Sequence, residues 1–192
     1  MDNVPGRRCF IAVSMSEAVI SSVEKLLSTL KTAGADVRWV STESMHLTIK
    51  FLGEIDEQQV DEVKEVLKEV VFSHSPFTFK VVGVGGFPNL RRPRVVWAGV
   101  SSSKELVSLH RDIEAGLSGR GFEPGVRDFI PHLTLGRIRS SGSIDQALSV
   151  LEKAGNCVFG KVEVRDVILM ESHLSPAGTK HNDLFAASLG EG

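Results

Sequence analysis

The sequence predicts an α+β protein with antiparallel sheets. Segments with helical spacing of apolar residues alternate irregularly with strand-like runs, without the regular strand–helix–strand rhythm of a parallel sheet. The tetrapeptide His-Leu-Thr-aliphatic occurs twice, at residues 46–49 and 132–135, and each copy lies in a strand-like run between two helical segments. The order strand, helix, strand with motif, helix therefore repeats, which indicates two similar lobes.

Four helices are expected from apolar residues spaced three or four positions apart. They cover residues 16–33, 56–72, 106–117 and, with a weaker pattern, 144–151. Asp56 is the expected N-cap of the second helix.

Strands are expected between these helices, in runs that proline and glycine residues separate. They lie at residues 9–14, 37–40, 46–52, 77–84, 93–100 and 132–138, in a long stretch at 158–170, and at 184–189. No linker of low complexity divides the chain, so residues 1–192 are expected to form a single domain.

The composition is typical of a soluble globular protein, with 42% hydrophobic and 24% charged residues. No apolar run reaches the roughly 20 residues that span a bilayer. The apolar stretch at residues 9–13 is shorter than the ~7–15 residues of a signal sequence. We therefore expect no membrane association, reduced thiols at Cys9 and Cys157, and a cytoplasmic location.

The formal net charge is −2, which argues against a protein that coats long nucleic acid through a broad basic surface. It remains compatible with a small basic site for one phosphate group. Basic residues cluster locally at 89–94 and 136–139. Such clusters are usually solvated loops unless a nearby group needs a cation.

Each motif copy presents an imidazole and a hydroxyl side by side, because alternate side chains of a strand point to opposite faces. In the first copy, alternation puts Leu47, Ile49 and Phe51 on the buried face, and His46, Thr48 and Lys50 on the polar face. In the second copy it puts Leu133 and Leu135 inside, with His132 and Thr134 outside. A strand anchored in this way holds catalytic groups in a fixed geometry.

Two such imidazoles suit phosphodiester transfer without a metal ion or other cofactor. Histidine has an unperturbed pKa of about 6.5, so one ring can accept a proton while the other donates one. The hydroxyls of Thr48 and Thr134 can donate hydrogen bonds to non-bridging phosphate oxygens. Arg137, three residues after Thr134, can add a charge-assisted contact to the same phosphate.

Other site chemistries find less support. A zinc site formed by His46 and His132 would need further ligands, and the sequence has no HExxH or CxxC motif. It also has no GxSxG nucleophile elbow and no P-loop. The four remaining histidines have no partner pattern and are expected in the core or on the surface: His74, His110, His173 and His181.

The chain resembles the RNA 2′,3′-cyclic phosphodiesterase family, also called 2′-5′ RNA ligases, of the two-histidine phosphoesterase superfamily. The hallmark of the family is a pair of His-x-Thr/Ser-x motifs, which His46–Ile49 and His132–Leu135 match. Residues 37–55, 83–100 and 129–139 also resemble blocks of the family, and the resemblance covers roughly residues 7–189.

The resemblance implies a bilobal α+β fold with an antiparallel sheet and helices in each lobe, and an active cleft between the lobes. The lobes would be interleaved in sequence, with strands from both ends of the chain in one lobe. The implied reaction is hydrolysis of RNA 2′,3′-cyclic phosphates to 2′-phosphates without metal or ATP. The reverse reaction would join RNA ends through a 2′-5′ bond.

The resemblance also implies roles for the site residues. His46 would protonate the leaving 3′-oxygen and His132 would activate the water. Thr48, Thr134 and Arg137 would bind the phosphate. Many members carry a tyrosine in the C-terminal block, whereas this chain has none; His181 lies close to that position. Either Phe51 or Phe87 is a candidate for base stacking in its place.

Two alternatives remain open at this stage. One is a module that binds RNA ends without turnover, although binding alone would not need both imidazoles. The other is a phosphodiesterase for a small cyclic nucleotide or a 2′-5′ oligonucleotide. In each case the expected partner is an RNA end or small nucleotide, and the expected state is a monomer.

Overall fold

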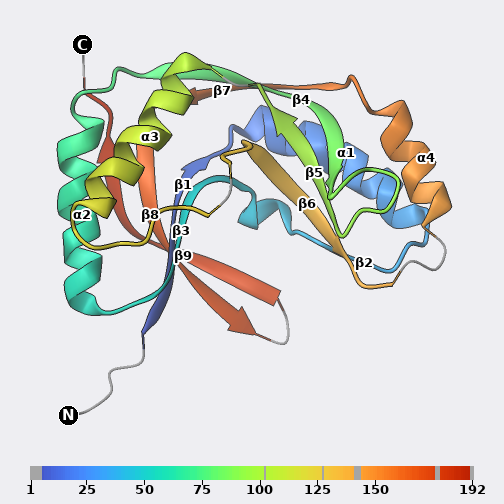
Figure 1. The fold of residues 1–192 in the computed structure, drawn as a ribbon. Helices are drawn as coiled ribbons and strands as arrows, with labels where there is room; N and C mark the ends of the chain where they lie inside the picture. The colour runs from blue at the N-terminus through green and yellow to red at the C-terminus, as the bar shows by residue number, and fades with distance from the viewer. Residues whose placement is uncertain (1–5, 102, 127, 141–143, 176–177, 191–192) are drawn as a thin grey trace.

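The structure, a computed structural model, describes residues 6–101, 103–126, 128–140, 144–175 and 178–190. In these residues the strands form two sheets in which every pairing is antiparallel, so the predicted α+β class is confirmed (Figure 1). Among the described helices, none is long and apolar enough to cross a membrane.

The four-stranded sheet contains strands from both ends of the chain. Its order is β3 (His46–Ile55), β1 (Arg7–Ser14), β8 (Asp166–Ser175) and β9 (Gly178–Ser188). The five-stranded sheet has the order β2 (Val37–Trp39), β6 (His132–Ile138), β5 (Val95–Val100), β4 (Phe77–Phe87) and β7 (Val158–Val164). The two sheets are therefore interleaved in sequence.

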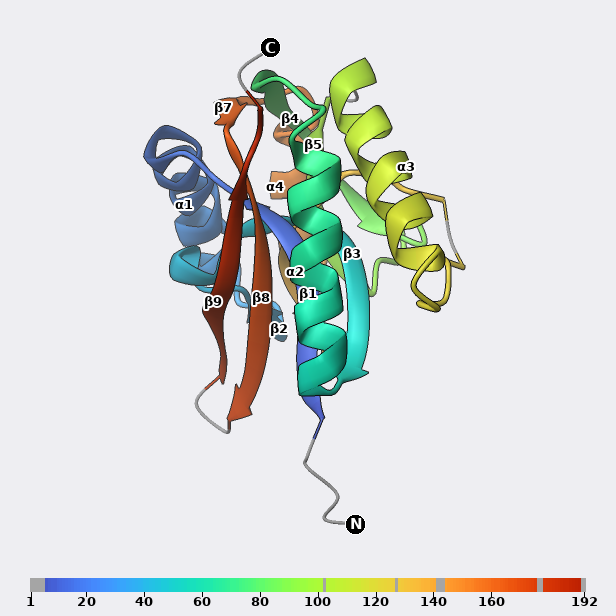
Figure 2. The same ribbon diagram turned by 90° about the vertical axis from the view of Figure 1, so that its left-hand side faces the viewer.

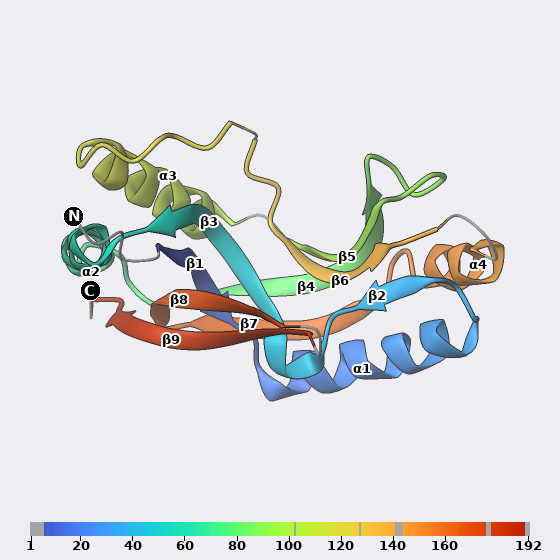
Figure 3. The same ribbon diagram turned by 90° about the horizontal axis from the view of Figure 1, so that it is seen from below.

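Each sheet is covered by helices. The helices are α1 (Glu17–Thr32), α2 (Glu57–Val71), α3 (Lys104–Ser118) and α4 (Asp145–Lys153). The helix α2 packs on β8 and β9 of the four-stranded sheet, with α3 at its side (Figure 2). The helices α1 and α4 lie side by side against the five-stranded sheet, on β7 and β4 (Figure 3).

The helix positions follow from caps and apolar stripes. The predicted N-cap Asp56 accepts a hydrogen bond from the Gln59 backbone, and the Gln59 side chain accepts one from the Asp56 backbone, forming a capping box. Of the apolar residues that predicted α2 and α3, Val70 is partly buried against the core and the others are buried: Val60, Val63, Val66, Leu67, Leu106, Leu109, Ile113 and Leu117.

Two strand predictions need correction. The stretch at 158–170 is two strands, because the chain turns at Arg165 and β8 pairs with β1 and β9 whereas β7 pairs with β4. The final strand begins at Gly178, six residues before the predicted start, because a polar extension pairs with the end of β8. His181 therefore lies within the final strand, opposite Ser172, and does not precede it.

The strand of the first motif carries a β-bulge at the third residue after its histidine. Lys50 lies opposite Ile11 and Thr48 lies opposite Ala12, so Ile49 has no residue opposite it in β1. A bulge reverses the side-chain alternation that follows it. Lys50 is only 6% exposed and Phe51 is 72% exposed, so the prediction of Lys50 on the polar face and Phe51 inside is wrong.

The strand of the second motif carries a bulge at the same position. Gly136 lies opposite Val96 and Thr134 lies opposite Trp97, so Leu135 has no residue opposite it in β5. After this bulge Ile138 packs against the core and Arg137 is exposed. The bulge thus brings Arg137 to the face of His132 and Thr134, where uninterrupted alternation would not put it.

Candidate functional site

The two motif strands contact each other where the sheets meet (Figure 1). A short connection ties them together. The strand β2 pairs with the end of β6, with Trp39 opposite Gly136, and the Val40 amide donates to the Leu135 carbonyl at 2.9 Å. The short helix η1 (Thr42–Ser44) then leads directly into His46. Sheet pairing on one side and a six-residue connection on the other therefore hold the two motifs close.

The His46 ring is packed among aromatic side chains. It stacks on the buried ring of Phe10, with centroids 4.7 Å apart and 29° between the planes. The His181 ring meets His46 edge-on at 4.9 Å and also meets Phe10 edge-on at 5.0 Å. The Ser44 hydroxyl, at 3.4 Å from the Thr179 carbonyl, fastens η1 to the strand that carries His181.

This packing lowers the pKa of His46 to about 4. Burial of the ring is the main cause, and the charge of protonated His181 adds to it, while a hydrogen bond with the Ser44 backbone acts in the opposite direction. Burial also lowers the pKa of His181. Near pH 7 the His46 imidazole of the free protein is therefore neutral.

His132 lies in a second group of aromatic rings. Its ring meets Phe87 edge-on at 5.0 Å and lies 6.2 Å from the Trp97 ring. Its Nδ1 atom lies 2.7 Å from the Ile130 carbonyl oxygen, which can only accept a hydrogen bond. Nδ1 must therefore carry a proton, and in the neutral ring Nε2 is the free basic nitrogen.

The threonines lie beside their histidines as predicted. Thr48 is opposite the small Ala12, and Thr134 is opposite Trp97. Both threonines are partly exposed, as are His46 and His132, whereas Leu47 and Leu133 between them are buried. Each strand therefore presents its imidazole and its hydroxyl on one accessible face.

Arg137 shares this face, as the pairing of three strands shows. Directly paired residues of neighbouring strands point the same way. Phe87 is opposite Val95, and Val95 is opposite Arg137, while the Phe87 ring contacts His132. In the first motif the equivalent position, five residues after the histidine, is occupied by Phe51, whose ring lies 6.2 Å from Phe10.

The lysine that the first bulge turns inward forms a buried ion pair with Glu114. The Lys50 ammonium donates to both carboxylate oxygens of Glu114 at 2.9 and 2.8 Å, and to the Glu123 carbonyl at 2.9 Å. All three of its protons are thus used. The Gly125 amide also donates to Glu114, at 3.2 Å.

These contacts continue toward the second motif. His110 lies 3.8 Å from Glu114, and its ring stacks on Phe129 at 4.0 Å with only 8° between the planes. Phe129 precedes His132 by three residues. The segment before β6 is therefore fixed at several points, and Lys50 connects that segment to the strand of the first motif.

Sequence reasoning missed several neighbours of the site. Phe10 and Trp97 were counted only as strand residues, and His181 was only noted for its position near the C-terminus. One signal was available for Trp97. The ring lies on Gly85, where a Cβ atom would come within 2.2 Å of it, and Gly85 belongs to the glycine-rich segment 83–86. The indole Nε1 of Trp97 and the Nδ1 of His181 are both buried without a partner among the described residues.

The other titratable clusters lie elsewhere. His74 pairs with Asp112 at 3.1 Å, and His173 lies 3.2 Å from Glu171. Across the described parts of the chain, no three His, Cys, Asp or Glu residues form a group that could hold a metal ion. Cys9 is buried and Cys157 is exposed, and both are free thiols.

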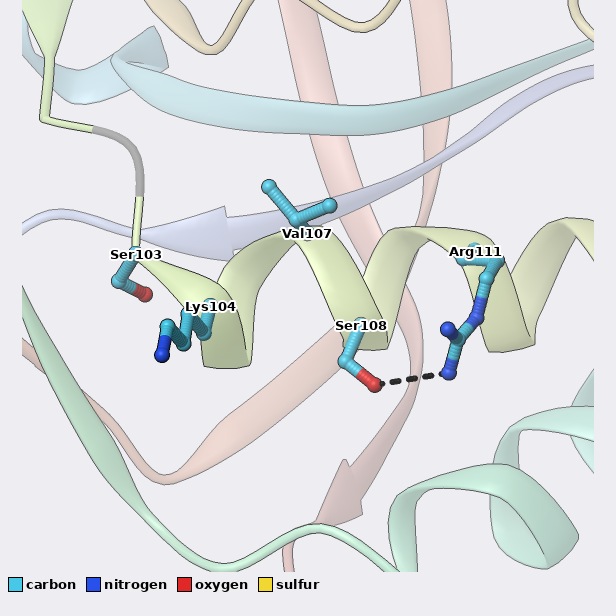
Figure 4. A pocket seen from close by; sticks show the side chains of 5 residues that line it. All are labelled: Ser103, Lys104, Val107, Ser108 and Arg111. Atoms are coloured by element: carbon cyan, nitrogen blue, oxygen red, sulfur yellow. Dashed lines mark hydrogen bonds between the residues drawn. The ribbon is translucent and has the colours of Figure 1, made fainter.

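A hollow of about 320 Å³ lies along the first turns of α3 (Figure 4). Ser103, Lys104, Val107, Ser108 and Arg111 line it. The Arg111 guanidinium donates to the Ser108 hydroxyl, and both side chains also contact Asp112, so these groups are satisfied within the helix. None of the lining residues comes from a motif strand, so we assign no role to this hollow.

The geometry described above agrees with comparisons to known proteins. A sequence profile described as "LigT like Phosphoesterase" matches residues 13–97 and 99–181, and each segment contains one His-Leu-Thr motif. The chain belongs to the LigT-like phosphoesterase family. Phosphoesterase activity follows from this membership, and the resemblance inferred from the motifs is confirmed.

Two relatives align with nearly the whole chain. The Methanothermobacter thermautotrophicus protein named RNA 2′,3′-cyclic phosphodiesterase is 34% identical over 177 residues, which is 92% of this chain and 96% of that one. The Archaeoglobus fulgidus protein of the same name is 36% identical, over 92% of this chain and 97% of that one.

Solved structures share the fold. The protein TT0787 of Thermus thermophilus superposes with a TM-score of 0.81 at 25% identity, over 96% of this chain and all of that one. E. coli LigT complexed with 3′-AMP superposes with a TM-score of 0.76 at 21% identity, over 97% of this chain and 99% of that one. The predicted arrangement of two similar lobes is therefore confirmed.

The titration of His46 provides the first test of the site. An NMR titration of the imidazole resonances should give His46 a midpoint near pH 4. In His181→Ala the midpoint should rise, because the neighbouring positive charge that lowers it is removed. A midpoint near 6.5 that does not respond to this substitution would contradict the described packing.

The Lys50–Glu114 pair should make a large contribution to stability. Lys50→Met leaves a mostly buried carboxylate without its partner and should cost roughly 3–5 kcal/mol in the free energy of unfolding, measured by urea denaturation. Lys50→Met/Glu114→Leu should cost clearly less than the sum of the two single substitutions. Strictly additive costs would show that the two charges are not coupled.

Proposed function

We propose that the protein hydrolyses 2′,3′-cyclic phosphates at RNA ends to 2′-phosphates, without a metal ion or ATP. One observation carries the proposal: two strands with the same bulge each present an imidazole and a hydroxyl on one face, where the two sheets meet. The names of relatives that align with 92% of the chain support the choice of substrate.

In the proposed reaction a water molecule attacks phosphorus, and the P–O3′ bond breaks. His132 accepts the proton of the water at Nε2, the nitrogen left free because Nδ1 donates to Ile130. His46 donates a proton to the departing 3′-oxygen, which leaves as a hydroxyl. The Thr48 and Thr134 hydroxyls and the Arg137 guanidinium would stabilise the charge on the non-bridging oxygens.

Because its lowered pKa leaves His46 neutral in the free protein, the ring must take up a proton from solvent when the substrate binds. Moving a pKa from 6.5 to about 4 corresponds to about 3 kcal/mol against the charged ring. A phosphate anion about 4 Å from the ring would stabilise the charged form of the ring by about 4 kcal/mol at an effective dielectric constant of 20. The substrate can therefore charge the imidazole that is to protonate its leaving group. In 2′-5′ joining, a 5′-hydroxyl would attack phosphorus in place of water, and the two imidazoles would keep the same roles.

Chelation tests the absence of a metal from the mechanism. The two imidazoles and the cationic side chain can supply both proton transfers and the charge stabilisation. Hydrolysis of a cyclic-phosphate-terminated RNA should therefore keep its rate after exhaustive treatment with chelator. Loss of activity that zinc or magnesium restores would refute this mechanism.

A substrate with an activated leaving group separates the two imidazoles. His46→Ala and His132→Ala should each lower kcat/KM for an RNA cyclic phosphate about 10²–10⁴-fold, the usual worth of a positioned acid or base. A nitrophenyl phosphodiester scarcely needs its leaving group protonated, so it should restore most of the activity of His46→Ala and little of that of His132→Ala.

The opposite pattern of rescue would exchange the acid and base assignments. Full activity in both variants would indicate that neither imidazole takes part in proton transfer. A wild-type protein that binds the RNA and never cleaves it would instead be a binding module, and one that prefers mononucleotide cyclic phosphates would be a small-molecule phosphodiesterase.

A further inference from the structure

Two basic segments that lie far apart in the sequence converge next to Arg137. One is the loop 88–94 between β4 and β5, and the other is the end of β6 with residue 139. Val95 lies opposite Arg137, and the Ile138 amide donates to the Arg94 carbonyl at 3.0 Å. The arginines of both segments therefore gather at one edge of the five-stranded sheet.

A third segment, β2, adds Arg38 directly opposite Arg137. Cβ atoms of such a pair lie about 4.5–5.5 Å apart on the same face, and like charges in that position destabilise the sheet. Both side chains are exposed, and no ion pair to either of them occurs within the described residues. The sheet thus holds two uncompensated cations side by side.

The loop holds its arginines outward by a defined turn. The Asn89 side-chain oxygen accepts hydrogen bonds from the amides of Arg91 and Arg92, both at 3.1 Å. Leu90 packs against the core and Pro93 is buried, so the loop is anchored. The Arg94 amide closes the loop by donating a hydrogen bond to the Phe87 carbonyl at 2.6 Å.

The resulting arginine edge consists of exposed arginines from three segments: Arg38, Arg91, Arg92, Arg94, Arg137 and Arg139. The Asp36 carboxylate borders it: the Asp36 backbone carbonyl accepts from the Arg139 amide, and its side chain accepts from the Ser140 hydroxyl. This concentration of positive charge occurs in a chain whose net charge is −2. It indicates a localised polyanion site that extends beyond a single phosphate.

We propose that the arginine edge binds the phosphates of the RNA strand that precede the reacting cyclic phosphate. This inference rests on the proposed function, because it assigns the substrate of the same site. Arg137 is shared between the reacting phosphate and the edge, and Arg38 is its immediate neighbour. Guanidinium groups bind phosphates in a bidentate way, and phosphate contacts give affinity without base specificity. The protein therefore prefers an RNA strand of several nucleotides over a mononucleotide.

The test compares two substrates with the same reacting end. One is a mononucleoside 2′,3′-cyclic phosphate, which has no preceding phosphate, and the other is a ten-nucleotide RNA that ends in the same nucleotide and cyclic phosphate. The test variant carries Arg38→Gln, Arg91→Gln, Arg92→Gln and Arg139→Gln, and leaves Arg137 in place. The matched control carries the same change of charge at arginines outside the edge: Arg8→Gln, Arg111→Gln, Arg120→Gln and Arg165→Gln.

The wild type and the control should both cleave the longer RNA with a kcat/KM at least 10-fold above that of the mononucleoside cyclic phosphate. Three phosphate contacts on a single strand would lower the kcat/KM for the longer RNA about 20-fold when the salt concentration rises from 50 to 200 mM. The test variant should lose the advantage of the longer RNA and most of its salt dependence, and keep its kcat/KM for the mononucleoside cyclic phosphate within about 2-fold.

Equal kcat/KM for both substrates in the wild type would overturn the inference while leaving the proposed function intact. An equal loss in the test variant and the control would also overturn it, because the effect would then come from total charge. If the wild type cleaves neither substrate, the proposed function fails. In that case fluorescence anisotropy with a labelled ten-nucleotide RNA still tests whether the arginine edge binds RNA. Loss of binding only in the test variant would support the inference. Absence of binding by the wild type would refute it.

Discussion

The bulge at the third residue after each motif histidine determines how the site is built. Before the bulge, the strand places His and Thr on the accessible face and leucine in the core. After it, alternation is reversed, and the residue five positions after the histidine joins the same face. In the second motif that residue is Arg137, and in the first it is Phe51. One backbone irregularity, used twice, thus makes the fifth residue after each histidine the third side chain on this face, where a regular strand would present the fourth.

The same bulge has a different consequence inside the protein. In β6 the residue after the bulge is Gly136, and the Trp39 ring fills the space where a side chain would lie. In β3 it is Lys50, whose ammonium group must be neutralised because it is nearly excluded from solvent. Glu114 provides that charge and at the same time fixes the segment that leads to His132. The strand of one motif therefore helps to position the histidine of the other.

The helices, the antiparallel sheets and the residues of the two motifs could be predicted from the sequence because they depend on local periodicity and on a repeated tetrapeptide. The interiors of the strands were less predictable. The register that creates the bulges at Ile49 and Leu135 is set by pairing with β1 and β5, which the pattern of a single strand does not contain. For the same reason Lys50 and Phe51 were assigned to the wrong faces. The convergence of Arg38, Arg94 and Arg137 likewise depends on which strands are neighbours.

The two imidazoles are similar in sequence context and different in environment, and this difference is what acid–base catalysis requires. His46 is enclosed by Phe10 and His181, and this enclosure disfavours its charged form until an anion arrives. His132 has a backbone carbonyl at Nδ1 that fixes its tautomer and leaves Nε2 as the basic nitrogen of the neutral ring. Two equivalent rings would titrate together and would compete for one role. In the proposed mechanism, binding of the phosphate anion therefore sets the protonation state of His46, while the tautomer of His132 keeps Nε2 available.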